Sequence, residues 1–576
     1  MKLPILSSIV SFLMLYIAAG GLVQSAALSA PPNIDIGGQD TQNDLEPRRQ
    51  LYRRQNDFHS LESLLKPLVA SGKASESDWK QLSEAQLRQA KWSEAIATAK
   101  ESILANGAGE TNLLQLFSTL QFSGNVEAAK DLLLDWQAAP APCRGKSLEE
   151  ALYRYEIWAA TRRYSFEYDL RHPTWHVGKD ITVIIPKRTS PFQQYDCTVS
   201  HSGGATLLTK GSRSWARWTV TGNSYPVLAG TMTLKPDFRR SRNDALSDSE
   251  RKQCLAEAQT QELSKDVPLA KIAREVRGKS PRETVQNILI WLANNFRGGQ
   301  AASPDPRDLI RSKVGTCANY SVVFLYLAHA NDIPARLDNC IAIWGLRRGM
   351  KQESPMAHAR VSVYLDSQWL SIEPQEMASL NCYFNDIAIF GYTPEDGEDG
   401  WGRPTSLQGL PTRITYLDYQ YPPDLDPHTV GRRPSNYLIF SGAELRAGCS
   451  VTNGATDLRQ HPTVGSQLLW GPTPGDRLQT EVEVPKEGFY DVGVSFANNE
   501  DNGRFHLVIN GRAFGQPLNL YSPSLHHWQG YNMGAVLLSA GRNHFQWVCL
   551  EHGSRSKGNW FGWNQLILHR TSQELK

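Results

Sequence analysis

The sequence has few cysteines, and none of them are closely paired. Its 576 residues contain 8 cysteines, and no two of these are spaced as CxxC. This pattern excludes the dense disulfide framework of small secreted domains, and it argues against a zinc ribbon, which needs closely paired thiols. We therefore expect no metal and no other cofactor.

A strong net charge is also missing. Lysine and arginine together number 60, and aspartate and glutamate 58, which leaves a formal net charge of +2 at pH 7. So balanced a charge gives no electrostatic reason to expect nucleic acid or an anionic membrane surface as a partner. Because single hydrophobic cores stop growing well below this chain length, we expect three or four domains.

Long apolar runs are absent apart from one at the N-terminus. There, Met1 and Lys2 precede an apolar run over 3–23, and small residues follow at 25–27. This is typical of a secretory signal peptide, which we place at residues 1–27. An uncleaved anchor is the alternative, because about 20 apolar residues can just span a bilayer. The signal-peptide interpretation predicts a secreted, periplasmic or cell-surface protein with no membrane span after cleavage.

Beyond a polar linker at 28–46, the residues over 47–170 have helical periodicity and repeat. Three similar segments begin at Phe58, Trp92 and Asn125, with spacings of 34 and 33 residues. They resemble a degenerate tetratricopeptide array of helix pairs. Such arrays usually hold a peptide or another domain, and the alternative is a helical spacer that packs on its neighbour.

The pattern then changes to short β-rich runs separated by glycine, proline, serine and asparagine. These runs, ITVIIP, YDCTVSH, ATLLTKG, ARWTVTG and AGTMTLKP, predict a small β domain at 171–245. We can assign no chemistry to this domain. Farther along, residues 387–434 are predicted to be a loop-rich linker, and the acidic stretch EDGEDG within it lacks the ordered ligand spacing of a calcium loop.

Between these two regions, the stretch VGTCANYSVVFLYL carries a cysteine where a helix is expected to begin. Residues 314–316 form a predicted turn, and apolar residues then recur with helical spacing, which places Cys317 in the first helical turn. Unsatisfied N–H groups and the helix dipole favour the thiolate there, and they can stabilise an oxygen that becomes negative during attack on a carbonyl. Cys317 is therefore a candidate nucleophile, and an inert buried thiol is the alternative.

A candidate base lies downstream in HARVSVYLDSQWLSIEP, which alternates as a β-hairpin with its turn at Asp366-Ser367. The apolar face fixes the register, because a slip by one residue would reverse the direction of its side chains. In that register His358 and Glu373 are diagonal neighbours on the other face, roughly 7 to 8 Å apart at the backbone. Glu373 can then orient His358 as the base of a nucleophile, base and carboxylate triad.

The order and spacing of three motifs resemble the core of the transglutaminase-like superfamily, which has a papain-like fold and a Cys-His-Asp triad. The motifs are GTCANY at 315–320, IPAR at 333–336 and HARVSVYLDSQWLSIEP at 358–374. The resemblance covers about residues 267–386, and we place the domain at 260–386. It implies Cys317 as nucleophile, His358 as general base and Glu373 as orienting acid. It also implies a protein or peptide substrate that is hydrolysed or transamidated at a peptide, isopeptide or side-chain amide bond, with water as the default acceptor.

Two departures from the family pattern leave two hypotheses open. Glu373 stands where the family usually has aspartate, and its side chain, longer by one methylene, can still reach His358. Arg360 stands where the family usually has an aromatic residue. In the predicted register Arg360 lies opposite Glu373 and could hold it in an ion pair, which would weaken its hold on His358. The chain is then either a cysteine enzyme or a non-catalytic cell-surface scaffold with a degenerate transglutaminase-like domain.

The last region, at 435–571, has alternating runs separated by turn signals such as Asn510-Gly511, and it predicts a β-sandwich. The order of its strands resembles carbohydrate-binding jelly-roll modules fused to secreted enzymes. The resemblance implies a cell-surface or extracellular glycan as a partner, and a plain structural domain is the alternative. The aromatic residues that would stack on a sugar are Trp528, Tyr531, Trp560 and Trp563.

Together these segments predict a multidomain α+β chain. From the N-terminus, it comprises helical repeats, a small β domain, a papain-like transglutaminase core and a C-terminal jelly-roll β-sandwich.

Overall fold

The computed structural model describes residues 42–571 with breaks, the longest of which are 169–176, 186–192, 220–227, 237–245, 257–264, 376–386, 390–412 and 429–435. The predicted signal peptide and most of the linker after it lie outside the described residues. The chain divides into two compact units, residues 1–50 and 51–576, and helix α2 (Gln42–Arg54) lies across the division. No helix in the described part of the chain combines the length and the hydropathy needed to cross a membrane.

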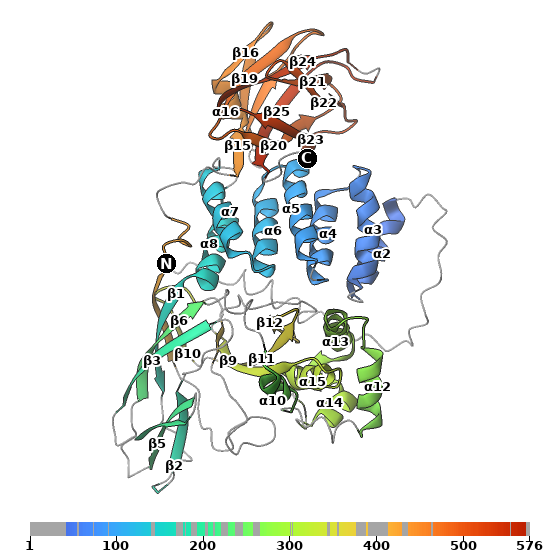
Figure 1. Ribbon diagram of the computed structural model, residues 1–576. Helices are drawn as coiled ribbons and strands as arrows, with labels where there is room; N and C mark the ends of the chain where they lie inside the picture. Colours follow the sequence, from blue (N-terminus) through green and yellow to red (C-terminus); the bar gives the residue numbers. More distant parts are fainter. Residues whose placement is uncertain are drawn as a thin grey trace, which may run out of the picture. The chain divides into compact units, whose positions relative to one another are not determined.

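The helical region consists of helix pairs that begin where the sequence repeat predicts. Its helices are α3 (Phe58–Ala70), α4 (Glu76–Arg88), α5 (Trp92–Asn106), α6 (Glu110–Phe122), α7 (Val126–Ala138) and α8 (Lys146–Ala159). Each helix packs against the next one in the chain (Figure 1). The predicted Asn125 caps α7, because its side chain accepts a hydrogen bond from the Ala128 backbone N–H. Leu61 and Ala95, at matching repeat positions, are buried, so the repeat reflects helix–helix packing.

The β domain follows as two antiparallel sheets. Its strands are β1 (Thr161–Tyr168), β2 (Asp180–Ile185), β3 (Gln193–His201), β4 (Thr206–Lys210), β5 (Arg213–Thr219) and β6 (Leu228–Pro236), joined by β10 (Lys351–Glu353) and β14 (Arg413–Gln420). The sheet orders are β10-β14-β1-β6-β3 and β2-β5-β4. The five predicted β runs are therefore confirmed as β2 to β6.

Three strands of this domain differ from the sequence-based expectation. β1 lies within the segment expected to be helical at 47–170, β14 lies within the segment expected to be loop-rich at 387–434, and β10 was not expected at all. β14 pairs with both β1 and β10, which are distant in the sequence. Such long-range pairing is not encoded in local alternation, so the sequence pattern could not reveal it.

The central domain packs helices against one face of a four-stranded sheet. Its helices are α10 (Asp248–Ala256), α12 (Val267–Glu275), α13 (Pro281–Asn295), α14 (Pro306–Ser312) and α15 (Cys317–His329). The sheet strands are β9 (Ala335–Ala342), β11 (Met356–Leu365), β12 (Gln368–Ile372) and β13 (Ile387–Ile389), in the order β12-β11-β9-β13. Apolar residues of α13, α15, β11 and β12 form one buried core. Because strand side chains alternate, the polar residues of the hairpin point to the other face.

A separate ladder precedes Cys317 in this domain. Strand β7 (Arg297–Gly298) pairs in parallel with β8 (Val314–Gly315), and the two form a two-stranded sheet. β8 leads directly into α15, so this ladder helps to fix where the helix begins.

The C-terminal region is a sandwich of two antiparallel sheets, as predicted. Its elements are β15 (Tyr437–Ser441), α16 (Gly442–Ala447), β16 (Cys449–Val451), β17 (Thr456–His461), β18 (Gly465–Trp470), β19 (Arg477–Val484), β20 (Gly488–Asn498), β21 (Arg504–Ile509), β22 (Arg512–Asn519), β23 (His526–Leu538), β24 (Gly541–Cys549) and β25 (Phe561–Arg570). One sheet has the order β17-β18-β25-β20-β23, with β15 beside β25, and the other has β16-β19-β24-β21-β22. Asn510 and Gly511, both with positive φ, form the predicted turn between β21 and β22.

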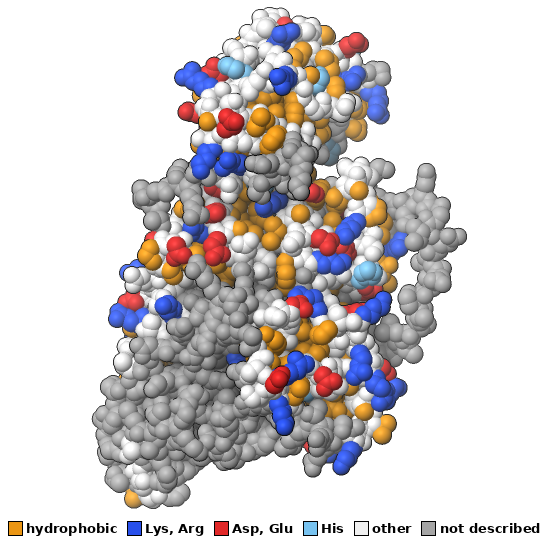
Figure 2. Space-filling model, in the orientation of Figure 1, with side chains coloured by type: hydrophobic (Ala, Val, Ile, Leu, Met, Phe, Trp, Pro, Cys, Tyr) orange, Lys and Arg blue, Asp and Glu red, His pale blue; other side chains and the backbone are white. Residues whose placement is uncertain are grey.

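The described surface carries both signs of charge. On the face drawn in Figure 2, the Lys and Arg side chains are interspersed with Asp and Glu, and neither sign forms a large patch. This distribution agrees with the small formal net charge of +2.

Candidate active site

The start of α15 presents Cys317 as its first residue, which confirms that the cysteine lies in the first helical turn. Thr316 caps the helix, and its backbone N–H and hydroxyl both donate to Asn319 Oδ1, at 2.9 and 3.0 Å. The preceding residue is glycine for a steric reason, because a Cβ on Gly315 would lie 2.6 Å from the Asn319 Cβ. Thr316 and Asn319 have the spacing of a reciprocal helix cap, a signal that our sequence analysis did not use.

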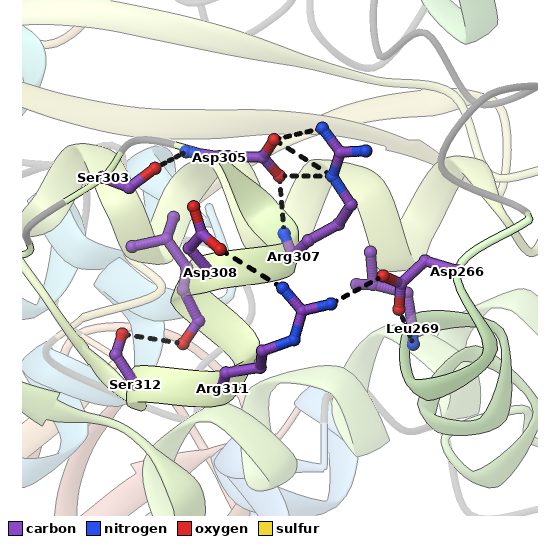
Figure 3. Close-up of polar contacts among 9 residues, drawn as sticks. Asp266, Leu269, Ser303, Asp305, Arg307, Asp308, Arg311 and Ser312 are labelled. Carbon is purple, nitrogen blue, oxygen red and sulfur yellow. Dashed lines mark hydrogen bonds and ion pairs between the residues drawn. The ribbon is translucent and has the colours of Figure 1, made fainter.

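Helix α14, which leads into β8, is anchored by charged side chains (Figure 3). Asp305 caps its first turn and accepts hydrogen bonds from the Arg307 backbone N–H at 2.8 Å and from its Nε at 2.9 Å. Arg311 bridges Asp308 and Asp266, each at 3.2 Å, and Asp266 is the residue that caps α12. Exposed ion pairs stabilise a fold by only about 0–1 kcal/mol each, so this network mainly orients α14 against α12.

The hairpin that carries the candidate base has the predicted register. Val361 pairs with Ile372, Val363 with Leu370 and Leu365 with Gln368. Asp366 and Ser367 form the turn, with φ values of 50° and 63°. These positive values are those of the primed turns that join two twisted antiparallel strands. The same register sends His358, at the start of β11, and Glu373, just after β12, to one face.

Within this arrangement, Glu373 contacts His358 directly. The His358 Nε2 lies 2.5 Å from Glu373 Oε2, and both side chains are buried. Arg360 also faces this carboxylate, but its Nε lies 3.6 Å from the same oxygen. The closer partner of Glu373 is therefore the imidazole, and Arg360 is a second, more distant cation.

The Cys317 thiol and the His358 imidazole shift each other toward their charged forms. Burial raises the pKa of Cys317, but its hydrogen bond with His358, the charge of His358 and the Ala359 backbone N–H together lower it below its ordinary value. For His358, burial lowers the pKa, whereas the hydrogen bonds and charges of Cys317 and Glu373 raise it to about 9. Opposite charges at hydrogen-bond distance favour ionisation of both groups. The Ala359 N–H is a contributor that no sequence signal identified.

Among the cysteines whose side chains the structure describes, Cys317, Cys449 and Cys549 are free thiols. Cys317 is therefore available to react. The pKa of the Cys549 thiol is shifted in the opposite direction, because burial and then the charge of Asp476 raise it to about 11. The lowered pKa at Cys317 is thus a property of its surroundings rather than of cysteines in this chain.

The four aromatic residues proposed to bind sugar do not share one surface. Trp563 is fully buried, its Nε1 donates to the Gln565 carbonyl at 3.0 Å, and its ring packs in the sandwich core. The assignment of Trp563 to a sugar-binding surface is therefore wrong, because no ligand can reach this ring. It lies inside strand β25, and its ring packs against Trp547 of the other sheet.

The other three aromatic residues differ in exposure. The Trp528 indole N–H donates to the Asn106 carbonyl at the end of α5, and the Tyr531 hydroxyl accepts from Asn498 Nδ2 at 2.6 Å. Burial raises the pKa of Tyr531. Trp560, by contrast, is 53% exposed and lies over Gly471, which leaves part of its ring open to solvent. Of the four residues, Trp560 has the most accessible ring.

Residues 270–374 match the model of the transglutaminase-like superfamily, and this interval contains Cys317, His358 and Glu373. No curated protein matches the chain. These residues therefore form a transglutaminase-like domain within a longer multidomain chain.

Solved structures show remote likenesses to parts of the chain. One is a candidate cysteine protease from Cytophaga hutchinsonii, 16% identical over 45% of this chain and 98% of that protein, with a TM-score of 0.29. Another is a family 35 carbohydrate-binding module from Clostridium thermocellum, 14% identical over 23% of this chain and 98% of the module, with a TM-score of 0.19. A third is a family 6 module from Zobellia galactanivorans, 16% identical over 23% of this chain and 99% of the module, with a TM-score of 0.19.

Proposed function

Starting from the transglutaminase-like domain at residues 270–374, we propose that this protein is an exported cysteine enzyme that transfers acyl groups from peptide or side-chain amide bonds. The observation that carries the proposal is the distance of 2.5 Å between His358 Nε2 and Glu373 Oε2, on an imidazole that also hydrogen-bonds Cys317. This arrangement supports a role for the buried side chains of His358 and Glu373 in activating the Cys317 thiol.

The proposed reaction has two steps. The Cys317 thiolate attacks the carbonyl carbon, the N–H groups at the start of α15 stabilise the oxygen that becomes negative, and the imidazolium of His358 gives its proton to the leaving amine. This leaves a thioester on Cys317. Neutral His358 then takes a proton from water, the hydroxide attacks the thioester, and the acid and the thiol are released. An amine in place of water would give transamidation.

Glu373 has a supporting role in both steps. It keeps the His358 ring oriented and stabilises the imidazolium that each step forms or consumes. The distances support this role over the scaffold hypothesis, which needs Arg360 to hold Glu373 away from His358. Arg360 Nε is 3.6 Å from the carboxylate oxygen, and His358 is the closer of the two.

Alkylation of the purified protein with iodoacetamide across a pH series tests the nucleophile. We expect Cys317 to be labelled below the pH at which ordinary thiols ionise, because its pKa is lowered. Peptide mapping identifies the labelled residue, and Cys449, a half-buried free thiol in the sandwich, is the internal reference. The Cys317→Ala variant should lose peptide-directed activity, and Cys449→Ala should keep it. A Cys317 that is labelled only in the pH range of an ordinary thiol would contradict the proposal.

We further propose that the sandwich at 435–571 binds a cell-surface or extracellular glycan through Trp560 and so holds the enzyme near its substrate. The exposed face of the Trp560 ring supports this, since a flat aromatic can stack on the apolar face of a sugar. A glycan array probed with the full chain and with Trp560→Ala tests it. Signals that Trp560→Ala does not reduce would remove Trp560 from the site.

Export itself is proposed from the apolar N-terminal run at 3–23, which is typical of a signal peptide. N-terminal sequencing of the protein recovered from the medium or the periplasm tests this. A mature chain that begins near residue 28 is expected, and a chain that retains Met1 in the cytoplasm would contradict it.

A further inference from the structure

Ser321 carries a buried hydroxyl, close to Cys317 in the sequence, that the proposed reaction does not use. It lies on α15 four residues after Cys317, so the two side chains share one face of the helix. Its side chain is fully buried, and its Oγ donates to the backbone carbonyl of Ala359 at 3.2 Å. Ala359 follows His358 in β11, so this hydrogen bond joins the helix that carries the thiol to the strand that carries the imidazole.

The ladder of the hairpin ends before it reaches Ala359. Alternate residues of an antiparallel strand direct their N–H and C=O groups to opposite sides. The Tyr364 N–H donates to the carbonyl of the residue before β9, at 2.9 Å, so the odd-numbered residues of β11 direct these groups to the β12 side. The last pair between β11 and β12 is Val361 with Ile372. In the same register Ala359 would lie opposite Pro374, which has no N–H to donate.

Helix α15 supplies the hydrogen bonds that β12 cannot supply at this point. The Ser321 hydroxyl donates to the Ala359 carbonyl, and the Ala359 N–H donates to the Cys317 sulfur. Two side chains about one helical turn apart therefore hold both backbone groups of one strand residue. Apolar packing between α15 and β11 is not directional, whereas two hydrogen bonds fix the position of the strand along the helix. Because His358 is the adjacent residue of the strand, its position relative to Cys317 is fixed as well.

We propose that Ser321 is a positioning residue whose hydroxyl, by holding the Ala359 carbonyl, keeps the Ala359 N–H on the Cys317 sulfur and keeps His358 within reach of it. The inference rests on the proposed function and adds to it a residue that acts on the thiol only through the backbone of β11. Without the hydroxyl, the buried carbonyl loses this donor, and the strand can shift along the helix. The N–H that stabilises the thiolate is then less well aligned.

Labelling of Cys317 with iodoacetamide across a pH series measures this effect without a substrate. The thiolate attacks the reagent, a thioether forms and iodide leaves, so the rate follows the fraction of thiolate. Burial and the charge of Glu373 raise the pKa of the thiol, whereas His358 and the Ala359 N–H lower it. Ser321→Ala keeps both titratable neighbours, so a change in its pH profile reports the placement of β11.

The chain offers a matched control for the loss of a buried hydroxyl. Ser83 in the helical region is also buried, and its Oγ donates to the Ala95 carbonyl at 3.1 Å. Ser83→Ala therefore removes the same kind of hydrogen bond from a different domain. Ser321→Thr is the conservative variant, because it keeps a hydroxyl at the site.

Two further measurements make the comparison interpretable. Thermal unfolding confirms that each variant is folded, and peptide mapping confirms that Cys317 is the labelled residue. If Ser321→Ala does not fold, Ser321→Cys replaces it, because a thiol is a weaker donor of similar size. Fragmentation of the labelled peptide then separates the introduced thiol from Cys317.

We expect Ser321→Ala to be labelled roughly threefold to tenfold more slowly than the wild type on the acid side of the profile, the effect of one hydrogen bond. At high pH, where the thiol is ionised in both proteins, the two rates should converge. Ser83→Ala should have the wild-type profile, and Ser321→Thr should recover most of the acid-side rate.

A Ser321→Ala profile that superimposes on that of the wild type, or an equal loss in Ser83→Ala, would overturn the positioning role and leave the nucleophile in place. A wild-type Cys317 that is labelled only in the pH range of an ordinary thiol would instead overturn the proposed function, and the role of Ser321 with it.

Discussion

The region around Cys317 and the C-terminal sandwich differ in how their candidate functional side chains are arranged. Cys317, His358 and Glu373 come from one helix and one hairpin and are joined through hydrogen bonds of His358, with Cys317 half-buried and the other two side chains buried. In the sandwich, Trp528 contacts a helix, Trp563 lies in the core and Trp560 faces solvent.

This difference follows from what burial requires of each kind of group. A buried carboxylate or imidazole needs a partner, so its position implies a specific neighbour. A buried aromatic ring needs only close packing, so its presence implies nothing about a ligand. Convergent buried polar groups are therefore the stronger sign of a functional site.

Among the variants that test this difference between the two regions, Glu373→Gln should have the largest effect on activity. The amide keeps the size of the side chain but cannot hold the imidazolium, so we expect hydrolysis to fall by on the order of 10²–10⁴-fold. Because Glu373 raises the pKa of His358, that pKa should also fall below about 9 in the variant. Steady-state kinetics against pH measure both effects, with Glu373→Asp as a control that keeps the charge. An unchanged rate would place Glu373 outside the site.

The pH dependence of the wild type tests the same network with no substitution. The raised pKa of His358, about 9 against an ordinary 6.5, means that the imidazolium persists until the pH passes about 9. Activity should therefore fall above about pH 9, where the leaving amine loses its proton donor. On the acid side, activity should fall as the thiolate is protonated, at a pH below the ordinary thiol range.

The interactions of His358 should also make the stability of the fold depend on pH. The interaction of His358 with Cys317 and Glu373 should stabilise the fold fully below its unfolded pKa of 6.5, and the contribution should be lost as the pH rises through about 9. Chemical unfolding of the wild type and of Glu373→Gln at several pH values measures it. A difference between them that grows above pH 9 would contradict the assignment.

Arg360→Met should have a moderate effect that separates the two hypotheses for this domain. Arg360 and Glu373 are each 2% exposed, and removing one member of a buried ion pair costs about 3 kcal/mol or more of unfolding free energy. In the folded fraction, we expect activity within about tenfold of the wild type, because His358 remains the closer partner of Glu373. If Arg360 instead held Glu373 away from His358, its removal would raise the activity. Arg360→Lys, which keeps the charge, is the control.

The sequence predicted the hairpin and its register because both are encoded locally. The alternation of Val361, Val363 and Leu370 fixes a register in which His358 and Glu373 must share a face, and the structure has that register. Strand β14 was missed because its partners β1 and β10 are distant in the sequence. Trp563 was misassigned for a related reason, since alternation does not show which face of β25 the second sheet covers.

The smallest effect expected is that of Trp560→Ala, and it tests whether the sandwich has a site at all. Trp560 is 53% exposed, so its removal should leave the unfolding free energy almost unchanged and weaken glycan binding by roughly fivefold to tenfold, the value of one stacked ring. Trp563→Ala is the matched contrast: the ring is fully buried, so the variant should lose about 3–5 kcal/mol of stability. Thermal unfolding and a titration with a glycan identified on the array measure the two effects. If Trp560→Ala binds the glycan as tightly as the wild type, the exposed Trp560 ring is not the sugar-binding surface. A structural role for the sandwich is then the better interpretation.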